Sequence, residues 1–208
     1  MLNRLQRSIE NRYDLTPHHR VSDFVVSDPE VVKLLGANPD LSSEQLLVRQ
    51  TDEDLELSLY LHRDLVDNIA ALNLNQMGAL IEGVSHFTYM TYCARHDRNT
   101  SQLELELQGE VDKFFGLAEH LETGTHDGRV DLRMLHSQLF RFVRWREGLS
   151  TESQQRYQAV NRLAGRLCRQ WMKRFGDNIR HPHWRTEARR FYRMTQRRKL
   201  RHAGGSGN

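Results

Sequence analysis

Glutamate and histidine side chains recur at helical spacing in the middle of the chain. Glu82 and His86 stand four residues apart. Glu106 and Glu110 repeat that interval in the next predicted helix. Residues four apart lie on one face of a helix, and facing helices of a bundle build non-haem iron or manganese sites from such carboxylates and imidazoles. The pattern therefore predicts a metal site, to which Asp112 contributes if the two helices run antiparallel.

The same residues also allow a purely structural interpretation. The usual di-metal motif is Glu-x-x-His, whereas Glu82 and His86 enclose three residues, and the sequence holds no second copy. In the structural interpretation, His86 donates a hydrogen bond to Asp112 or Glu82 within a buried polar network. Lys113 and the two glutamates of the following helix then lie on a solvated face.

Positive charge is concentrated in the last quarter of the chain. The whole chain carries +3, but residues 156–208 carry +13 and residues 1–155 carry −10. Arginine pairs bidentately with phosphate, and aromatic side chains between arginines stack on bases, so this composition predicts binding to RNA or single-stranded DNA. The predicted nucleic-acid-binding residues are Arg141, Arg144, Arg146, Trp184, Arg185, Arg189, Arg190, Phe191, Tyr192, Arg193, Arg197, Arg198, Lys199 and Arg201.

Other partners for the basic segment stay open. It can fold back onto the acidic part of its own chain, or dock on an acidic protein or on a second copy of the chain. Membrane binding ranks last, because the apolar face of Ala188, Phe191 and Tyr192 is too short for firm insertion. The first hypothesis is a non-enzymatic nucleic-acid-binding or regulatory protein. The alternatives are an adaptor or homo-oligomer, and a helical non-haem metalloprotein.

Motifs of common enzyme classes are missing from the sequence. It contains no Gly-x-Ser-x-Gly, Gly-x-x-x-x-Gly-Lys or Gly-x-Gly-x-x-Gly segment, which argues against a standard hydrolase or nucleotide-binding enzyme. Cys93 and Cys168 belong to no Cys-x-x-Cys pair, so we expect reduced, buried thiols. We predict no catalytic residue and no bound cofactor.

Hydrophobic periodicity indicates which elements must position these residues. Leu55, Leu57, Leu59 and Leu61 alternate with polar residues, which predicts a β-hairpin over about residues 46–61 with an acidic turn. Elsewhere the period is helical, and the predicted helices cover about residues 2–13, 30–35, 63–72, 76–95, 101–122, 132–143, 151–175 and 185–201. We predict a mainly α, single-domain helical bundle with a small N-terminal hairpin.

The predicted bundle has three parts. Residues 1–62 form N-terminal helices and the hairpin, residues 63–176 form the core, and residues 177–208 form a basic helix with a frayed tail. No apolar run approaches the length of ~20 residues that spans a membrane, and the N-terminus has no apolar signal region. We therefore expect a cytoplasmic protein.

Overall fold

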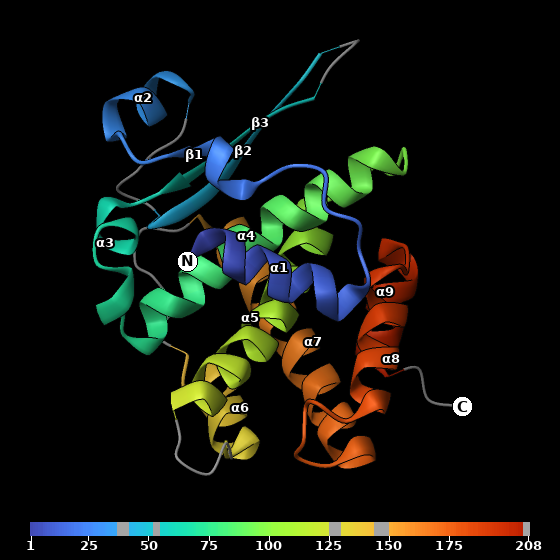
Figure 1. Cartoon of the computed structure of the whole chain (residues 1–208). Helices are drawn as coiled ribbons and strands as arrows, with labels where there is room; N and C mark the ends of the chain where they lie inside the picture. Colours follow the sequence, from blue (N-terminus) through green and yellow to red (C-terminus); the bar gives the residue numbers. More distant parts are fainter. Residues whose placement is uncertain (37–41, 52–54, 125–129, 144–149, 206–208) are drawn as a thin grey trace.

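The computed structural model describes residues 1–36, 42–51, 55–124, 130–143 and 150–205 (Figure 1). These residues form a mainly α-helical fold with one small sheet, as predicted. In chain order the elements are α1 (Leu2–Tyr13), the 3-10 helix η1 (Val21–Phe24), β1 (Val25–Val26), α2 (Pro29–Leu34), β2 (Glu44–Gln50), β3 (Leu55–Leu61), α3 (Arg63–Val66), the 3-10 helix η2 (Ile69–Ala71), α4 (Leu74–Arg95), α5 (Gln102–Gly124), α6 (Leu132–Phe140), α7 (Thr151–Phe175), α8 (Pro182–Tyr192) and α9 (Gln196–Gly204).

The predicted hairpin is confirmed as the pair β2 and β3. The two strands are antiparallel, with Glu44 opposite Leu61 and Gln50 opposite Leu55. The short strand β1 adds to β3 in parallel, which gives the strand order β1-β3-β2. The buried ends Leu59 and Leu61 of β3 face the helical core. The predicted acidic turn at residues 52–54 lies outside the described residues.

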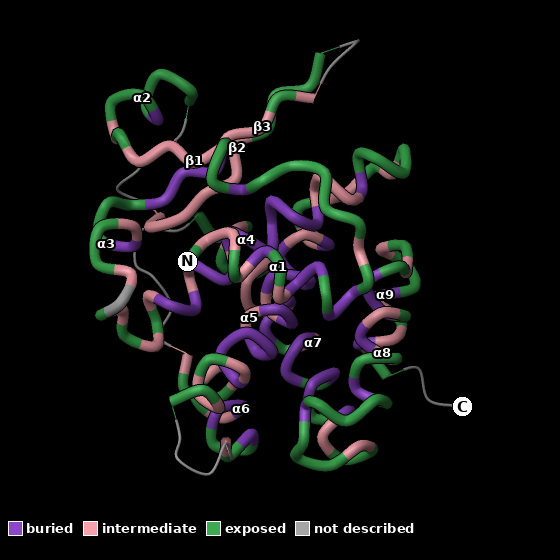
Figure 2. The backbone as a smooth tube through the Cα atoms, in the orientation of Figure 1, coloured by how far each residue is buried: buried purple, intermediate pink, exposed green. Residues whose placement is uncertain are grey.

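Helix α4 is the central element of the bundle. It is buried on most of its circumference, and Figure 2 shows buried backbone concentrated in α4, α5 and α7. The short link after Arg95 folds α5 back along α4, and no other pair of elements in the described residues packs more extensively. The helix begins at Leu74, two residues before the predicted start at residue 76. Asn73 accepts a hydrogen bond from the backbone of Gln76, whose side chain accepts one from Asn73.

Three other predicted boundaries need correction. Residues 63–72 form two short helical segments, α3 and η2, instead of one helix. Helix α6 ends at Phe140, before the predicted residue 143, whereas α7 has the predicted bounds and begins after Ser150, whose hydroxyl oxygen accepts a hydrogen bond from the backbone of Ser153 at 3.2 Å. The predicted basic helix over residues 185–201 is two helices, α8 and α9, separated at residues 193–195. Ala203, predicted to belong to a frayed tail, is a buried residue of α9.

A buried polar network ties α1, α4 and α5 together. The carboxylate of Asp112 accepts hydrogen bonds from Arg12 at 3.0 Å and from Tyr13 at 2.6 Å. Its second oxygen accepts from Ser85 at 2.6 Å and from Gln108 at 3.1 Å. Because every oxygen of this fully buried carboxylate has donors, its charge is compensated inside the core.

Within the described residues, no helix combines the length and apolar character of a membrane span.

Candidate functional site

The two pairs predicted from the sequence, Glu82 with His86 and Glu106 with Glu110, meet between α4 and α5. Ligand atoms of Glu82, His86 and Glu106 lie within 4.8 Å of one another. The exposed fraction is 5% for His86 and 7% for Glu106, so both side chains are withdrawn from solvent. Glu110 lies one turn beyond Glu106 on the same face of α5, as the spacing predicts. We define Glu44, Glu82, His86, Glu106 and Glu110 as the carboxylate–histidine cluster.

Glu44 of β2 belongs to this cluster, although the sequence did not indicate it. Its carboxylate lies 3.7 Å from Nδ1 of His86. The approach is close because Gly83 of α4 has no side chain: a Cβ there would lie 3.4 Å from Cβ of Glu44 and 3.3 Å from Cδ1 of Leu59. Sheet and helix therefore pack tightly at this point. The sequence signal was only an acidic residue near the start of a predicted strand.

A second glycine places the imidazole against α5. A Cβ on Gly109 would lie 2.6 Å from Nε2 of His86, a distance that no side chain tolerates, and 3.3 Å from Cγ of Glu82. Gly109 stands between Glu106 and Glu110 in the sequence of α5. Nε2 of His86 is therefore aimed at the part of α5 that carries both carboxylates.

Lysine and arginine side chains offset part of the negative charge. Nζ of Lys113 lies 2.9 Å from the carboxylate of Glu82 and 2.7 Å from that of Glu110. The side chain of Lys113 is largely withdrawn from solvent, so the expectation that it lies on a solvated face was wrong. From α7, Arg156 acts electrostatically on Glu106. Two cations thus face four carboxylates, and the cluster carries two negative charges when His86 is neutral.

Burial and charge perturb the protonation of the cluster. Burial alone lowers the pKa of His86, but the carboxylates of Glu44, Glu106 and Glu82 outweigh it and raise the value to about 9. Burial raises the pKa of Glu106 to about 7, with Glu82 and Glu44 acting in the same direction against His86. Burial also raises the pKa of Glu110, against the opposing effect of Lys113. Groups perturbed in this way are typical of functional sites.

Three polar atoms of the cluster are buried without a hydrogen-bond partner among the described residues. They are Oε2 of Glu44, Nε2 of His86 and Oε2 of Glu110. An unpartnered buried polar atom costs roughly 1–3 kcal/mol, and more when the group is charged. A nitrogen and carboxylate oxygens are donors that manganese and non-haem iron take, and the ligand atoms that lie close to one another are those of Glu82, His86 and Glu106.

Asp112, predicted as a further metal ligand, lies outside this cluster. Its carboxylate is directed to Arg12, Tyr13, Ser85 and Gln108, as described above. Asp112 follows Glu110 by two residues on α5, so its side chain lies on another face of the helix. The expected hydrogen bond from His86 to Asp112 is not formed.

The predicted nucleic-acid-binding residues divide into buried and exposed groups. Trp184, Phe191, Tyr192 and Lys199 have an exposed fraction of 0%, so none of them offers a surface to a base. Arg189 is half-buried and donates a hydrogen bond from Nε to the carbonyl of Arg12 at 3.0 Å. These five side chains serve the protein's own packing.

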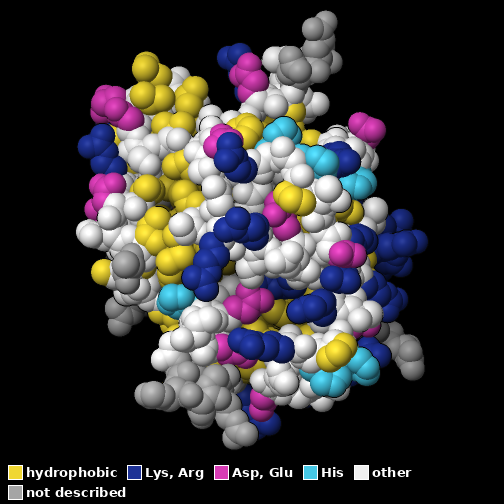
Figure 3. Space-filling model, viewed as in Figure 1, with side chains coloured by type: hydrophobic (Ala, Val, Ile, Leu, Met, Phe, Trp, Pro, Cys, Tyr) yellow, Lys and Arg dark blue, Asp and Glu magenta, His cyan; other side chains and the backbone are white. Residues whose placement is uncertain are grey.

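The remaining predicted residues stay at the surface where the structure describes them. Arg190, Arg193, Arg198 and Arg201 line a groove of about 790 Å³. On the side of the molecule where Figure 1 shows α8 and α9, lysine and arginine side chains gather at the surface (Figure 3). Arg141, Arg185 and Arg197 are also exposed. Arg144 and Arg146 lie outside the described residues.

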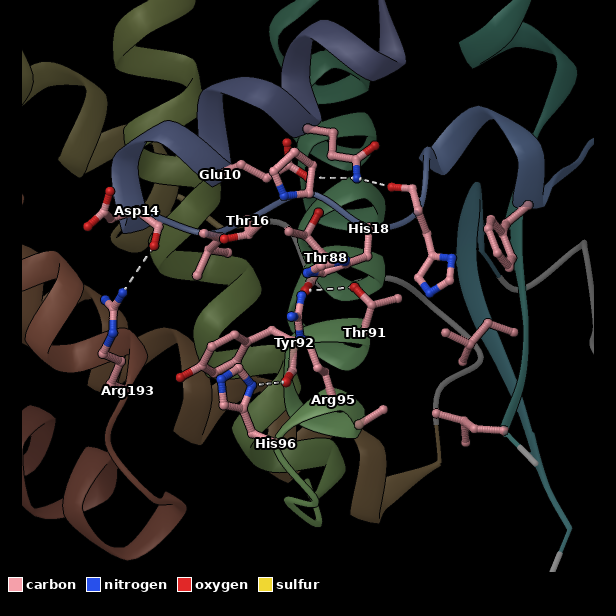
Figure 4. A pocket seen from close by; sticks show the side chains of 18 residues that line it. Glu10, Asp14, Thr16, His18, Thr88, Thr91, Tyr92, Arg95, His96 and Arg193 are labelled. Atoms are coloured by element: carbon pink, nitrogen blue, oxygen red, sulfur yellow. Dashed lines mark hydrogen bonds between the residues drawn. The ribbon is translucent and has the colours of Figure 1, made fainter. Parts of the chain in front are cut away.

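A cavity of about 780 Å³ opens between α1, β3 and the C-terminal half of α4 (Figure 4). Its lining combines Glu10 with the cationic or titratable side chains of His18, Arg95 and His96. Nδ1 of His96 donates a hydrogen bond to the carbonyl of Tyr92 at 2.8 Å. Sequence reasoning did not predict this cavity. Its mixed charges select no ligand class.

Three elements that are distant in the sequence supply the carboxylate–histidine cluster. Glu44 lies on β2, Glu82 and His86 on α4, and Glu106 and Glu110 on α5. Tyr157 of α7 faces the same carboxylates; burial, together with these carboxylates, raises its pKa to about 12.

Comparisons with models of known protein families, with curated proteins and with solved structures found no match for this chain.

Proposed function

We propose that this protein is a helical metalloprotein that binds one divalent ion, Mn²⁺ or Fe²⁺, in the carboxylate–histidine cluster. The observation that carries the proposal is the buried imidazole of His86, whose Nε2 has no partner among the described residues and is aimed at the carboxylate-bearing face of α5. His86, Glu82 and Glu106 form the ligand set, because their ligand atoms already lie within 4.8 Å of one another. Carboxylates combined with one imidazole suit manganese or non-haem iron.

The charge of the cluster supports a divalent ion. Binding through Nε2 displaces the proton that His86 carries at neutral pH, and four ionised carboxylates with the two cations Lys113 and Arg156 then leave two negative charges in a region withdrawn from water. An isolated buried charge is unfavourable unless it is paired or bound to a metal. A divalent cation would offset both charges and would give Nε2 of His86 a partner at the same time.

Two conservative substitutions test the proposed ligands. We expect wild-type protein purified without chelator to contain close to one equivalent of metal by elemental analysis. Apo protein should bind Mn²⁺ in calorimetric titrations. His86→Gln and Glu106→Gln should weaken binding by about 100-fold or more, since even residues that only orient metal ligands contribute about 10- to 100-fold. His120→Gln and Glu152→Gln, at exposed positions of α5 and α7, are matched controls that should bind like wild type.

The stability of the metal-free protein separates a binding site from a structural network. In chelator, Glu106→Gln should unfold at the same or a higher temperature than wild type, because it removes one of several crowded carboxylates. Added Mn²⁺ should raise the melting temperature of wild type and leave that of the variant unchanged. The proposal fails if apo Glu106→Gln is clearly less stable than apo wild type, or if His86→Gln binds Mn²⁺ as tightly as wild type.

A further inference from the structure

The groove between α8 and α9 continues into a row of cations on α7. Arg162, Arg166, Arg169 and Lys173 are all exposed, and their spacing of four, three and four residues places them on one face of the helix. The row is about 16 Å long at 1.5 Å per residue. We name these four residues the α7 row. Sequence reasoning on the last helix missed it.

The α7 row and the groove form one surface. Arg166 donates a hydrogen bond to the carbonyl of Gly204 at the end of α9. Gln170, between Arg169 and Lys173 on α7, lines the groove together with Arg198. The groove also contains Arg190, Arg193, Arg201 and His202. We call the α7 row and the groove together the basic surface.

The acidic part of the chain leaves this surface largely unneutralised. Within the described residues, Glu187 is the carboxylate that pairs with its cations, at 3.7 Å from Arg190 and 4.0 Å from His202. Glu187 also lies 4.0 Å from Arg174. One carboxylate at the outer limit of ion-pair distance cannot balance the seven lysine and arginine side chains that this surface has besides Arg201. The basic segment folds back in part: Arg189 and Lys199 dock inside, Arg180 pairs with Glu122 at 2.8 Å, and Arg193 donates a hydrogen bond to the carbonyl of Asp14 at 3.2 Å.

Met194 is the one large apolar residue that lines the groove beside the cations. The large hydrophobic side chains that are exposed in the described part of the chain are Met1, Val31, Leu34, Leu35, Val48, Met134 and Phe142, and none belongs to α7, α8 or α9. The apolar faces of α8 and α9 are instead buried in the core. A membrane-binding helix needs an apolar face that enters the lipid, so this surface is unsuited to a bilayer.

We infer that the basic surface binds the sugar–phosphate backbone of a nucleic acid without stacking on its bases. An extended row of guanidinium groups beside a groove fits a ligand with negative charges at short, regular intervals, and guanidinium pairs bidentately with phosphate. Because Trp184, Phe191 and Tyr192 are buried, base stacking plays no part, and the binding is independent of sequence. This inference does not depend on the proposed metal.

Binding to labelled oligonucleotides tests the inference. The full-length protein, in chelator, is titrated into a mixed-sequence RNA and into a DNA duplex, with fluorescence anisotropy as the readout. Raising the salt from about 50 mM to about 200 mM should weaken binding steeply, with a slope of log K against log salt near −4 for four or five phosphate contacts. Arg169→Glu combined with Arg198→Glu should weaken binding by about tenfold or more at the lower salt concentration.

A matched variant controls for net charge. Arg4→Glu combined with Arg63→Glu changes the charge equally but at the start of α1 and on α3; in Figure 1 the N-terminus and α3 lie on the opposite side of the molecule from α9. This control should bind like wild type. The inference is overturned if neither oligonucleotide binds at low salt, or if both double variants lose affinity equally. It is also overturned if polyglutamate displaces the RNA as well as unlabelled RNA does at equal charge concentration, because an acidic protein would then be the better partner.

Discussion

The position of the His86 imidazole depends on Gly109, a residue that has no side chain. Gly109 allows Nε2 of His86 to approach the backbone of α5, and Gly83 allows Glu44 to approach α4 from the sheet. Glycine in the interior of a helix costs about 1 kcal/mol relative to alanine, so each of these positions lowers the intrinsic stability of its helix. The close contacts they permit are those that assemble the carboxylate–histidine cluster.

Gly109→Ala tests whether the position of the His86 imidazole depends on this close contact. The new Cβ would lie 2.6 Å from Nε2 of His86, so the imidazole must turn away from the carboxylates of α5. We expect Mn²⁺ affinity to fall by about tenfold or more while the helical content measured by circular dichroism is retained. Gly124→Ala, where nothing lies within 4 Å of the new Cβ, is the control and should bind Mn²⁺ like wild type. Unchanged affinity of Gly109→Ala would place the metal away from Nε2.

At the scale of elements, a buried lysine holds α9 against α5. Nζ of Lys199 donates a hydrogen bond to the side-chain carbonyl of Gln108 at 2.7 Å and lies 4.0 Å from the ring centre of Tyr89. Burial lowers the pKa of Lys199 to about 7, although Glu104 and Asp112 act in the opposite direction. An unfolded lysine keeps its ordinary pKa near 10.4. The folded state therefore binds fewer protons than the unfolded state between these two values.

The sign of the resulting pH dependence follows from this difference. Below about pH 7 Lys199 is charged in both states, and folding carries the full cost of burying the charge. As the pH rises from about 7 toward 10, Lys199 should add at most about 1.4 kcal/mol per pH unit to the free energy of unfolding. Lys199→Met should lose this contribution, so its stability relative to wild type should be highest near pH 7 and fall toward pH 9.

Chemical denaturation at these two pH values measures the contribution. Subtracting the free energy of unfolding of the variant from that of wild type removes the groups that titrate in both proteins, His86 among them. Lys173→Met replaces an exposed lysine of α7 and should show no such pH dependence. If the difference between wild type and Lys199→Met is the same at pH 7 and pH 9, Lys199 does not titrate in this range.

On the scale of the whole molecule, the C-terminal helices complete the hydrophobic core. Trp184, Phe191 and Tyr192 are fully buried, and Tyr192 stacks on Tyr13 of α1 with ring centres 4.0 Å apart. The indole Nε1 of Trp184 donates to the carbonyl of Gly176 at 3.1 Å. Helices α8 and α9 therefore pack between α1, the first helix of the chain, and the part of the core formed by the end of α7.

Removing residues 181–208 should abolish cooperative unfolding. Truncating one buried aromatic side chain to alanine costs about 3–5 kcal/mol, so losing three approaches or exceeds the stability of a typical domain. Because the truncated protein is expected not to fold, Phe191→Leu provides a graded test and should lower the melting temperature measurably by calorimetry. Arg197→Ala, at an exposed position of α9, should leave it nearly unchanged. A truncated protein that melts cooperatively near the wild-type temperature would show that the C-terminal helices are an appendage.

The local pattern of side chains was enough to predict the mainly α fold and the β2–β3 pair. Alternating leucines specify a strand with one buried face, and apolar residues around the circumference of α4 specify a central helix. These signals arise from neighbours in the chain, so they are present in the sequence itself. The pairs Glu82–His86 and Glu106–Glu110 were predicted for the same reason, since four-residue spacing places both members of a pair on one face of a helix.

Contacts between distant segments were decided by the tertiary structure. Glu44 joins His86 only because a sheet strand packs over Gly83, and Asp112 leaves the cluster because Arg12 and Tyr13 of α1 surround it. The same holds for the basic segment, which is divided at residues 193–195 into two helices whose buried faces hold the aromatic side chains and Lys199. Charge and residue type are properties of the chain, whereas the direction in which a side chain faces depends on which surfaces the folded core must bury.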